Sequence, residues 1–138
     1  SKRYEVDIKE YKSKKTLQQN NYFWKLTTEI TRVENGGVFN RDDLDITYRN
    51  LLEMANAKFT FLLLPSDAIN DFKGKFRAIK NLGTCDVKGV EFTNLQVFYG
   101  ISTMNTKEMS NLIDVTLDYA YKVGVADVKN YWEEILKG

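Results

Sequence analysis

The chain has 138 residues, of which 43% are hydrophobic and 28% charged, and its formal net charge of +1 excludes a polycation. This length and composition predict one globular domain, residues 1–138, with a single core. The longest apolar run is far shorter than the roughly 20 residues of a membrane-spanning helix, and the lone cysteine, Cys85, cannot form an internal disulfide, so we expect a cytoplasmic protein that does not bind membranes.

The first elements are predicted to be a strand and a helix. Apolar and charged residues alternate over residues 4–8, which is typical of a half-buried strand. Thr16 is expected to cap the following helix, with Gln19 completing a capping box. Phe23 lies on the apolar stripe of this helix, and the Asn-Gly-Gly sequence at residues 35–37 predicts its end.

The middle of the chain is predicted to contain a second helix and several strands. The helix begins near Asn40, with acidic residues in its first turn. Residues 58–64 form a strand that is apolar on nearly both faces, which predicts that it is central or covered on both sides. Residues 69–79 have helical spacing, and the extended residues 85–99 change parity at 93–94, which predicts a bulge or turn there.

The last predicted elements are two helices. Asn105 and Glu108 form a capping box ahead of the clearest amphipathic helix, which Gly124 ends. Asp127 is expected to cap a short final helix. The order of elements predicts an α+β fold with a small, mostly antiparallel sheet of three or four strands, helices packed on it, and a long C-terminal amphipathic helix followed by the short one.

The sequence lacks the residues that most enzymes use. It has no histidine and no glycine-rich phosphate loop, which argues against His-based catalysis, zinc binding and nucleotide hydrolysis. We expect no catalytic residue, no cofactor and no metal. Asp42 and Asp45 share one face of a helix and could hold Mg²⁺ in a nuclease, but acidic residues at a helix N-terminus are also explained by the helix dipole.

Positive charge is concentrated in two segments. Residues 1–15 carry six Lys or Arg against three acidic residues, and residues 73–88 carry five against one. Such clustering can form a basic patch on a near-neutral protein, although lysines placed only for solubility give the same pattern. The candidate contacts to DNA phosphates are Lys12, Lys14, Lys15, Lys73, Lys75, Arg77 and Lys80.

Aromatic residues make single-stranded nucleic acid a candidate ligand. Proteins that bind single strands combine a basic groove with exposed aromatic side chains on which bases stack. The chain has eight Phe, eight Tyr and two Trp, and Tyr22 points most nearly away from the core stripe of its helix. We therefore predict that Tyr22 stacks on a base, while aromatic residues that serve only the core or a dimer interface remain the alternative.

Two segments resemble signatures of the phage NinB-type family, which includes the lambda Orf recombination mediator. The first covers residues 15–24, and its matching positions are Leu17, Gln19, Asn20 and Trp24, with Thr16 in place of serine. The second covers residues 105–114, and residues 121–125 also follow the family pattern. The two segments have the same order and a similar separation as in the family, and together they frame about three quarters of the chain.

The resemblance implies a non-catalytic, homodimeric mediator of DNA recombination that acts in the infected bacterial host. Proteins of this family are expected to bind single-stranded DNA and the host single-strand-binding protein. The four motif residues fit capping and packing at least as well as binding. A protein–protein adaptor that acts on host replication or recombination proteins without binding DNA remains an alternative, which the low net charge favours.

Overall fold

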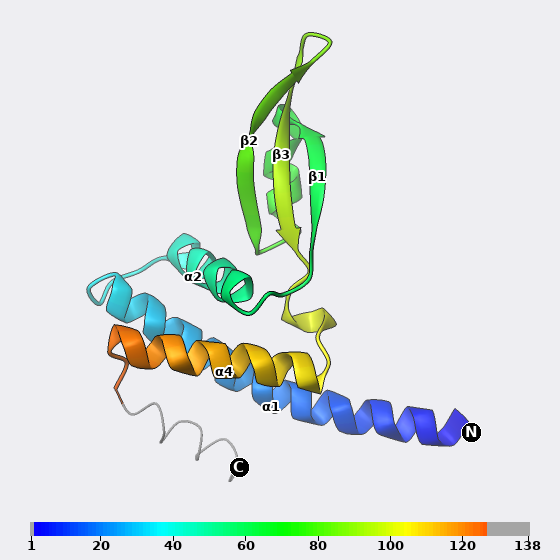
Figure 1. Cartoon of the computed structure of the whole chain (residues 1–138), viewed down its shortest axis with the longest axis vertical. Helices are drawn as coiled ribbons and strands as arrows, with labels where there is room; N and C mark the ends of the chain where they lie inside the picture. Colours follow the sequence, from blue (N-terminus) through cyan, green and yellow to red (C-terminus); the bar gives the residue numbers. More distant parts are fainter. Residues whose placement is uncertain (1, 127–138) are drawn as a thin grey trace.

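The chain folds into a layer of helices from which a small sheet projects (Figure 1). In the computed structural model, the backbone is described for residues 2–126 and the side chains for residues 17–126. The described elements confirm the predicted α+β class, whereas the short final helix predicted to begin at Asp127 lies outside them. None of the helices in this described part combines the length and the hydropathy that crossing a membrane requires.

Helix α1 (Lys2–Glu34) is one continuous helix. The strand predicted over residues 4–8 is therefore wrong. No glycine or proline interrupts this segment, and Tyr4, Ile8 and Tyr11 also recur at helical spacing. The segment is thus compatible with either element, and the helix extends through it.

Thr16 lies inside α1 and does not cap it, so the predicted capping box is wrong. The side chain of Gln19 instead reaches helix α4 (Thr106–Val123), where its amide nitrogen donates to Ser110 Oγ at 3.0 Å. The predicted end of the helix is confirmed, because α1 stops at Glu34 and two glycines with positive φ follow shortly after it.

Helix α2 (Arg41–Met54) begins where the sequence predicts. The Asn40 side chain accepts a hydrogen bond from the Asp43 N–H at 2.9 Å, and the Asp43 carboxylate accepts one from the Asn40 N–H at 3.1 Å. This reciprocal cap satisfies two N–H groups that would otherwise lack partners at the start of the helix. Figure 1 shows α2 between the sheet and the other two long helices.

Helices α1 and α4 pack along one another in the same direction, and their shared face forms much of the core (Figure 1). The predicted capping box at Asn105 and the left-handed Gly124 bound α4. Three threonines are fully buried in the core, namely Thr27, Thr31 and Thr116. Each hydroxyl donates to the carbonyl four residues earlier in its own helix, so none of the three buried hydroxyls is an unsatisfied donor.

The sheet contains three antiparallel strands in the order β1-β3-β2. The strands are β1 (Phe59–Pro65), β2 (Ile79–Val87) and β3 (Val90–Phe98). Lys88 and Gly89 connect β2 to β3 with φ angles of 53° and 83°. Positive φ at both residues is what a two-residue hairpin turn of the favoured hand requires.

Two predictions for this region need correction. The bulge or turn predicted at residues 93–94 is wrong, because β3 continues through them and the irregularity lies opposite, in β2. Only part of the helix predicted over residues 69–79 forms. Helix α3 (Ile69–Lys73) ends at Gly74, and the chain then enters β2, which is consistent with the poor helix propensity of glycine.

The two faces of the sheet differ in burial. Thr93, Leu95 and Val97 are buried on the face covered by α3 and the short helix η1 (Ser66–Ala68), where Ser66 Oγ lies 2.8 Å from Thr93 Oγ1 (Figure 1). The opposite face of β1 exposes three apolar side chains, Phe59 by 45%, Phe61 by 63% and Leu63 by 48%. Among the described residues β1 is an edge strand with an uncovered face, so the prediction that it is central or covered on both sides is wrong.

A buried hydrogen bond connects α2 to the segment between the sheet and α4. The Tyr48 hydroxyl oxygen accepts from the Ile101 N–H at 3.0 Å, and the neighbouring Gly100 has a φ of 85°. A Cβ atom on Gly100 would lie 2.9 Å from the Tyr48 hydroxyl oxygen. Only glycine therefore fits this position without displacing Tyr48.

We expect Gly100→Ala to destabilise the protein through this contact. Gly89→Ala is the matched control, because Gly89 has a similar φ of 83° and nothing lies within 4 Å of its added Cβ. The control should lose about 1–2 kcal/mol of unfolding free energy to backbone strain alone. Gly100→Ala should lose about 1–3 kcal/mol more, measured by chemical denaturation. Equal losses in the two variants would show that the Tyr48 contact costs nothing.

Candidate nucleic-acid interface

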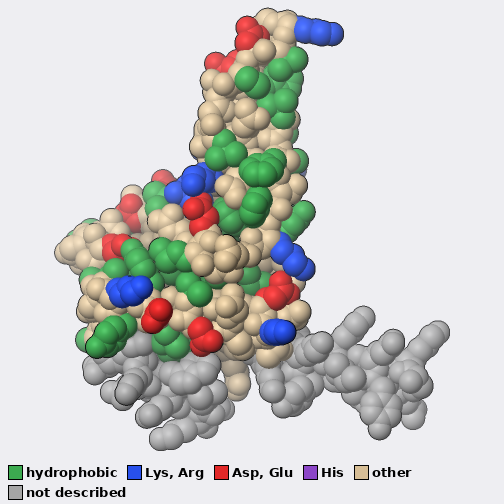
Figure 2. All heavy atoms as spheres, viewed as in Figure 1, with side chains coloured by type: hydrophobic (Ala, Val, Ile, Leu, Met, Phe, Trp, Pro, Cys, Tyr) green, Lys and Arg blue, Asp and Glu red, His purple; other side chains and the backbone are tan. Residues whose placement is uncertain are grey.

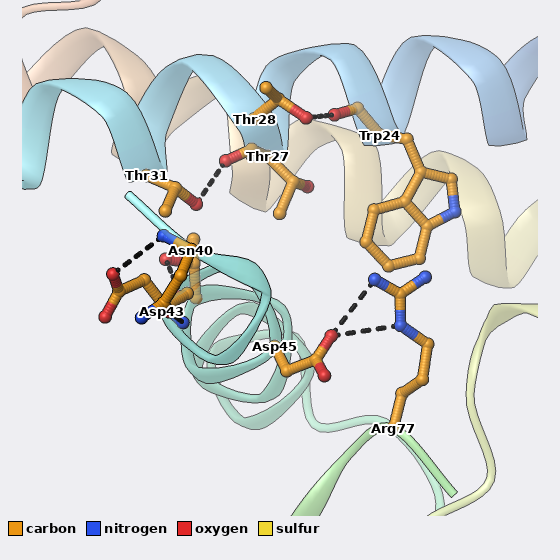
Figure 3. Close-up of polar contacts among 9 residues, drawn as sticks. Trp24, Thr27, Thr28, Thr31, Asn40, Asp43, Asp45 and Arg77 are labelled. Carbon is orange, nitrogen blue, oxygen red and sulfur yellow. Dashed lines mark hydrogen bonds and ion pairs between the residues drawn. The ribbon is translucent and has the colours of Figure 1, made fainter. Parts of the chain in front are cut away.

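Arg77 joins the sheet to helices α1 and α2. It lies just before β2, and its guanidinium carbon is 4.2 Å from the centre of the Trp24 ring. Its Nε and Nη2 atoms each lie 3.0 Å from Asp45 Oδ1 (Figure 3). The ring face and the carboxylate both attract the positive charge, and together they hold the guanidinium in one orientation.

An aromatic cluster lies next to Arg77. The ring centres of Trp24 and Tyr48 are 4.7 Å apart, and Phe23 lies 5.4 Å from Trp24 and 5.8 Å from Tyr48. Trp24 is half-buried, whereas Phe23 and Tyr48 are buried. Burial raises the pKa of the Tyr48 hydroxyl, so the cluster adds no negative charge beside the ion pair at neutral pH.

A cavity of about 340 Å³ opens beside this cluster. Its wall combines aromatic rings with cationic, amide and hydroxyl groups. The side chains that could contact a ligand there are those of Asn20, Trp24, Lys75, Phe76, Arg77, Tyr99 and Ser102. Phe76 and Tyr99 are 39% and 50% exposed. Exposed rings beside positive charge suit a nucleobase and its phosphate.

A second cavity, of about 280 Å³, adjoins the first, because Phe76 and Arg77 line both. The charged residues in its wall are Asp42, Asp45, Arg49, Lys73 and Arg77. Arg49 donates to the Ile79 carbonyl at 3.4 Å, but its buried Nε has no hydrogen-bond partner in the part of the chain that is described. Cations outnumber carboxylates in this wall, so the cavity favours an anionic group.

The carboxylates of the second cavity share its wall with cations. Asp45 pairs with Arg77, and Asp42 lines the same wall as Arg49 and Lys73. Among the described residues, no group of three or more His, Cys, Asp or Glu side chains could hold a metal ion. The nuclease alternative therefore gains no support from this geometry.

Part of the second basic segment, residues 73–88, lines the two cavities. Lys73 and Lys75 are exposed and line one cavity each, and neither forms an ion pair with another described residue. Arg77 lines both cavities but shares its charge with Asp45. Lys80 lines neither, and its Nζ lies 3.3 Å from Glu53 Oε1 of α2. We therefore leave Lys80 out of the interface, because this contact ties β2 to α2.

The first basic segment lies on α1. Lys12, Lys14 and Lys15 precede Asn20, which lines the first cavity, by five to eight residues. Their side chains are outside the described residues. A helix rises about 1.5 Å per residue, so the backbone of these lysines lies about 7–12 Å from Asn20 along the helix axis. The backbone of the first basic segment therefore continues along α1 from the residue that lines the first cavity.

Tyr22 is fully buried, so the prediction that it stacks on DNA is wrong. It packs in the core with Phe23 and Leu26, because α1 contacts both α2 and α4 and buries a wider face than a single stripe. The exposed rings at the cavities belong to Phe76 and Tyr99. The basic residues around Phe76 are a signal that sequence reasoning could have used, whereas nothing local marks Tyr99.

Two of the four motif residues, Asn20 and Trp24, line the first cavity. Gln19 contacts α4, and Leu17 is 61% exposed. The interpretation of the motif as capping and packing therefore describes only part of it. Asn20 and Trp24 border the candidate interface.

Comparisons of the chain with protein-family models, with curated proteins and with solved structures found no match. The resemblance to the phage family therefore depends on the sequence segments alone.

Tyr22 makes the stability of the fold sensitive to alkaline pH. Burial raises the pKa of its hydroxyl from 10.0 to about 12. The hydroxyl ionises near pH 10 in the unfolded chain but keeps its proton in the folded one, so the stability it contributes is complete below pH 10 and is lost as the pH rises to about 12. We expect Tyr22 alone to lower the unfolding free energy by about 1.4 kcal/mol per pH unit in this range, measured by denaturation at each pH.

Tyr22→Phe removes the ionisable group and should make this alkaline loss shallower. Tyr121→Phe, which changes an exposed residue, should keep the original slope. Part of the loss should persist in Tyr22→Phe, because the pKa of Tyr119 is raised by its hydrogen bond to Glu34 and that of Tyr48 by burial. An unchanged slope in Tyr22→Phe would contradict the assignment.

Proposed function

We propose that this protein binds single-stranded DNA at the two cavities around Arg77 and catalyses no reaction on it. The observation that supports this function is the convergence of the exposed Lys73 and Lys75 with the exposed rings of Phe76 and Tyr99. Bases stack on aromatic rings, and cations neutralise the neighbouring phosphates. We call these four residues and Arg77 the binding face.

Single-stranded DNA fits the binding face better than a duplex does. Stacking on Phe76 or Tyr99 requires bases that are free of their Watson–Crick partners. The net charge of +1, together with Asp42 and Asp45 in the wall of the second cavity, limits the attraction to the dense charge of a duplex. Affinity should therefore depend on stacking as much as on charge.

The resemblance to phage recombination mediators supplies a role for such binding. A mediator that holds single strands of any sequence needs stacking and phosphate contacts but no readout of base edges. On the resemblance alone, we include the host single-strand-binding protein as a second partner. Capture of a host protein without any DNA binding at low salt would instead favour the adaptor.

The affinity for a labelled oligonucleotide should fall steeply with salt. Each phosphate contact to a single strand contributes about −0.7 to the slope of log K against log salt concentration. Lys73 and Lys75 would give about −1.4, because Arg77 is paired with Asp45, and contacts from Lys12, Lys14 and Lys15 as well would give about −3.5. We expect the steeper slope, and we expect Lys12, Lys14 and Lys15 changed together to Gln to reduce it to about −1.4. An absence of binding at low salt would remove the proposal.

Tyr99→Ala should weaken DNA binding roughly 5- to 150-fold, because one stacked base is worth about 1–3 kcal/mol. Tyr121→Ala is the matched control, since Tyr121 is 81% exposed on α4 and lines neither cavity. Oligonucleotide titration measures both variants, and circular dichroism checks that they fold. Equal effects of the two changes would contradict the location of the binding face.

Asp45→Asn should strengthen DNA binding, because it releases Arg77 from its carboxylate partner and leaves it to a phosphate. The slope of log K against log salt should steepen by about 0.7, which corresponds to one more phosphate contact. Asp42→Asn removes a carboxylate from the same cavity without breaking the ion pair, so it should leave the slope unchanged. Weaker binding by Asp45→Asn would mean that Asp45 is needed to position Arg77.

A further inference from the structure

The outer edge of β1 presents free backbone groups. β1 pairs with β3 on one side, and no described strand pairs with its other side. The Tyr99 N–H donates to the Lys58 carbonyl at 3.1 Å, and hydrogen-bonded pairs alternate along an antiparallel ladder. Even-numbered residues of β1 therefore point their backbone groups toward β3, and the groups that point outward belong to Phe59, Phe61 and Leu63.

The same three residues carry the exposed apolar side chains of β1, and Figure 2 shows hydrophobic side chains along this face of the projecting sheet. Edge strands are normally protected by charges, bulges or proline. The opposite edge, β2, has a bulge between Asn81 and Gly83 and carries Lys80 and Asp86. In β1 the single protecting residue is Pro65, at the very end of the strand. The edge of β1 is thus suited to pairing with another strand.

A second copy of β1 fits this edge in detail. Antiparallel pairing centred on Leu62 aligns residues 59–65 of one copy with residues 65–59 of the other. It places Phe61 of each copy opposite Leu63 of the other. Both residues point their backbone groups outward, so they become the hydrogen-bonded pairs of the new ladder. Opposed residues share a face of the sheet, so the exposed apolar side chains of the two copies lie side by side.

The charges around the strand also favour a second copy. β1 has no charged residue, so no like charges meet across the two-fold axis. Lys58, whose Nζ lies 3.9 Å from Glu108 Oε2 and whose side chain stays 77% exposed, comes opposite Ser66 of the second copy and next to the exposed Asp67. Symmetry repeats this opposite-charge pair at the other end. The strand itself has no Lys or Arg that could pair with a DNA phosphate.

We propose that two copies of this chain associate through antiparallel pairing of their β1 strands, centred on Leu62. The pairing joins the two sheets into one. The outward backbone groups of Phe61 and Leu63 form hydrogen bonds with the second copy, and the side chains of these residues become partly covered. It involves the edge of the sheet opposite β2 and Arg77, so it does not depend on DNA binding.

Sedimentation velocity over a range of concentrations tests the association. The unmodified chain should reach twice the mass of one chain. Phe61→Lys combined with Leu63→Lys places like charges opposite one another and should leave single chains. Phe61→Lys combined with Leu63→Glu places opposite charges there and should restore the double mass. Leu82→Lys, at an exposed position of β2, should keep the double mass.

A disulfide tests the register without adding charge. In a Cys85→Ser background, Leu62→Cys brings two cysteines to the axis, with Cα atoms about 4.5 Å apart. Leu64→Cys is the matched control on the same face of β1, and its two cysteines would lie about 14 Å apart. With oxidised glutathione as the electron acceptor, Leu62→Cys should form covalent dimers and Leu64→Cys should not.

Single chains at every concentration would overturn the proposal. A double mass that persists in the double-lysine variant would also overturn it, and so would equal cross-linking of the two cysteine variants, because the interface would then lie elsewhere. Circular dichroism checks that each variant folds. Should the double-lysine variant fail to fold, the cysteine pair decides the question alone.

Discussion

The position of the sheet relative to the helices depends on the guanidinium of Arg77. This group lies against Trp24 of α1 and pairs with Asp45 of α2, so the chain entering β2 is attached to both helices. The ion pair between Lys80 and α2 continues the attachment along β2. Partly exposed ion pairs contribute little one at a time, but Arg77 adds a ring face and a two-nitrogen contact with one carboxylate oxygen, which restricts its direction as well as its distance.

The candidate interface lies at this same junction. Substitutions of its residues therefore differ in whether a loss of DNA binding can be assigned to a lost contact with DNA. Trp24, Asp45 and Arg77 hold the sheet in place and also line the cavities, so changing them alters structure and ligand contacts together. Lys75 and Tyr99 line the first cavity from exposed positions outside that set of contacts. Loss of binding on changing Lys75 or Tyr99 is therefore the clearer sign of direct contact with DNA.

The features that local sequence encodes were predictable. The cap at Asn40 and the cap at Asn105 each depend on residues three positions apart, and both helices start there. Tyr22 shows the opposite case, because it is buried in a core that α1 shares with α2 and α4, and both of these helices come later in the sequence. The basic character of residues 73–77 was likewise visible in the sequence. Their position beside Tyr99 and Trp24 needed the fold, since three separate elements supply them.

For strand β1, the sequence and the structure of a single chain disagree about whether both faces are covered. A strand that is apolar on nearly both faces is expected to be covered on both, yet in one chain Phe59, Phe61 and Leu63 remain exposed. Pairing of β1 with a second copy would reduce this disagreement without any rearrangement of the fold. Because Arg77 adjoins the opposite edge of the sheet, such a dimer would leave Arg77 and the neighbouring Lys75 and Phe76 of each copy free, and one DNA strand long enough to reach both copies would be held with the avidity of two linked sites.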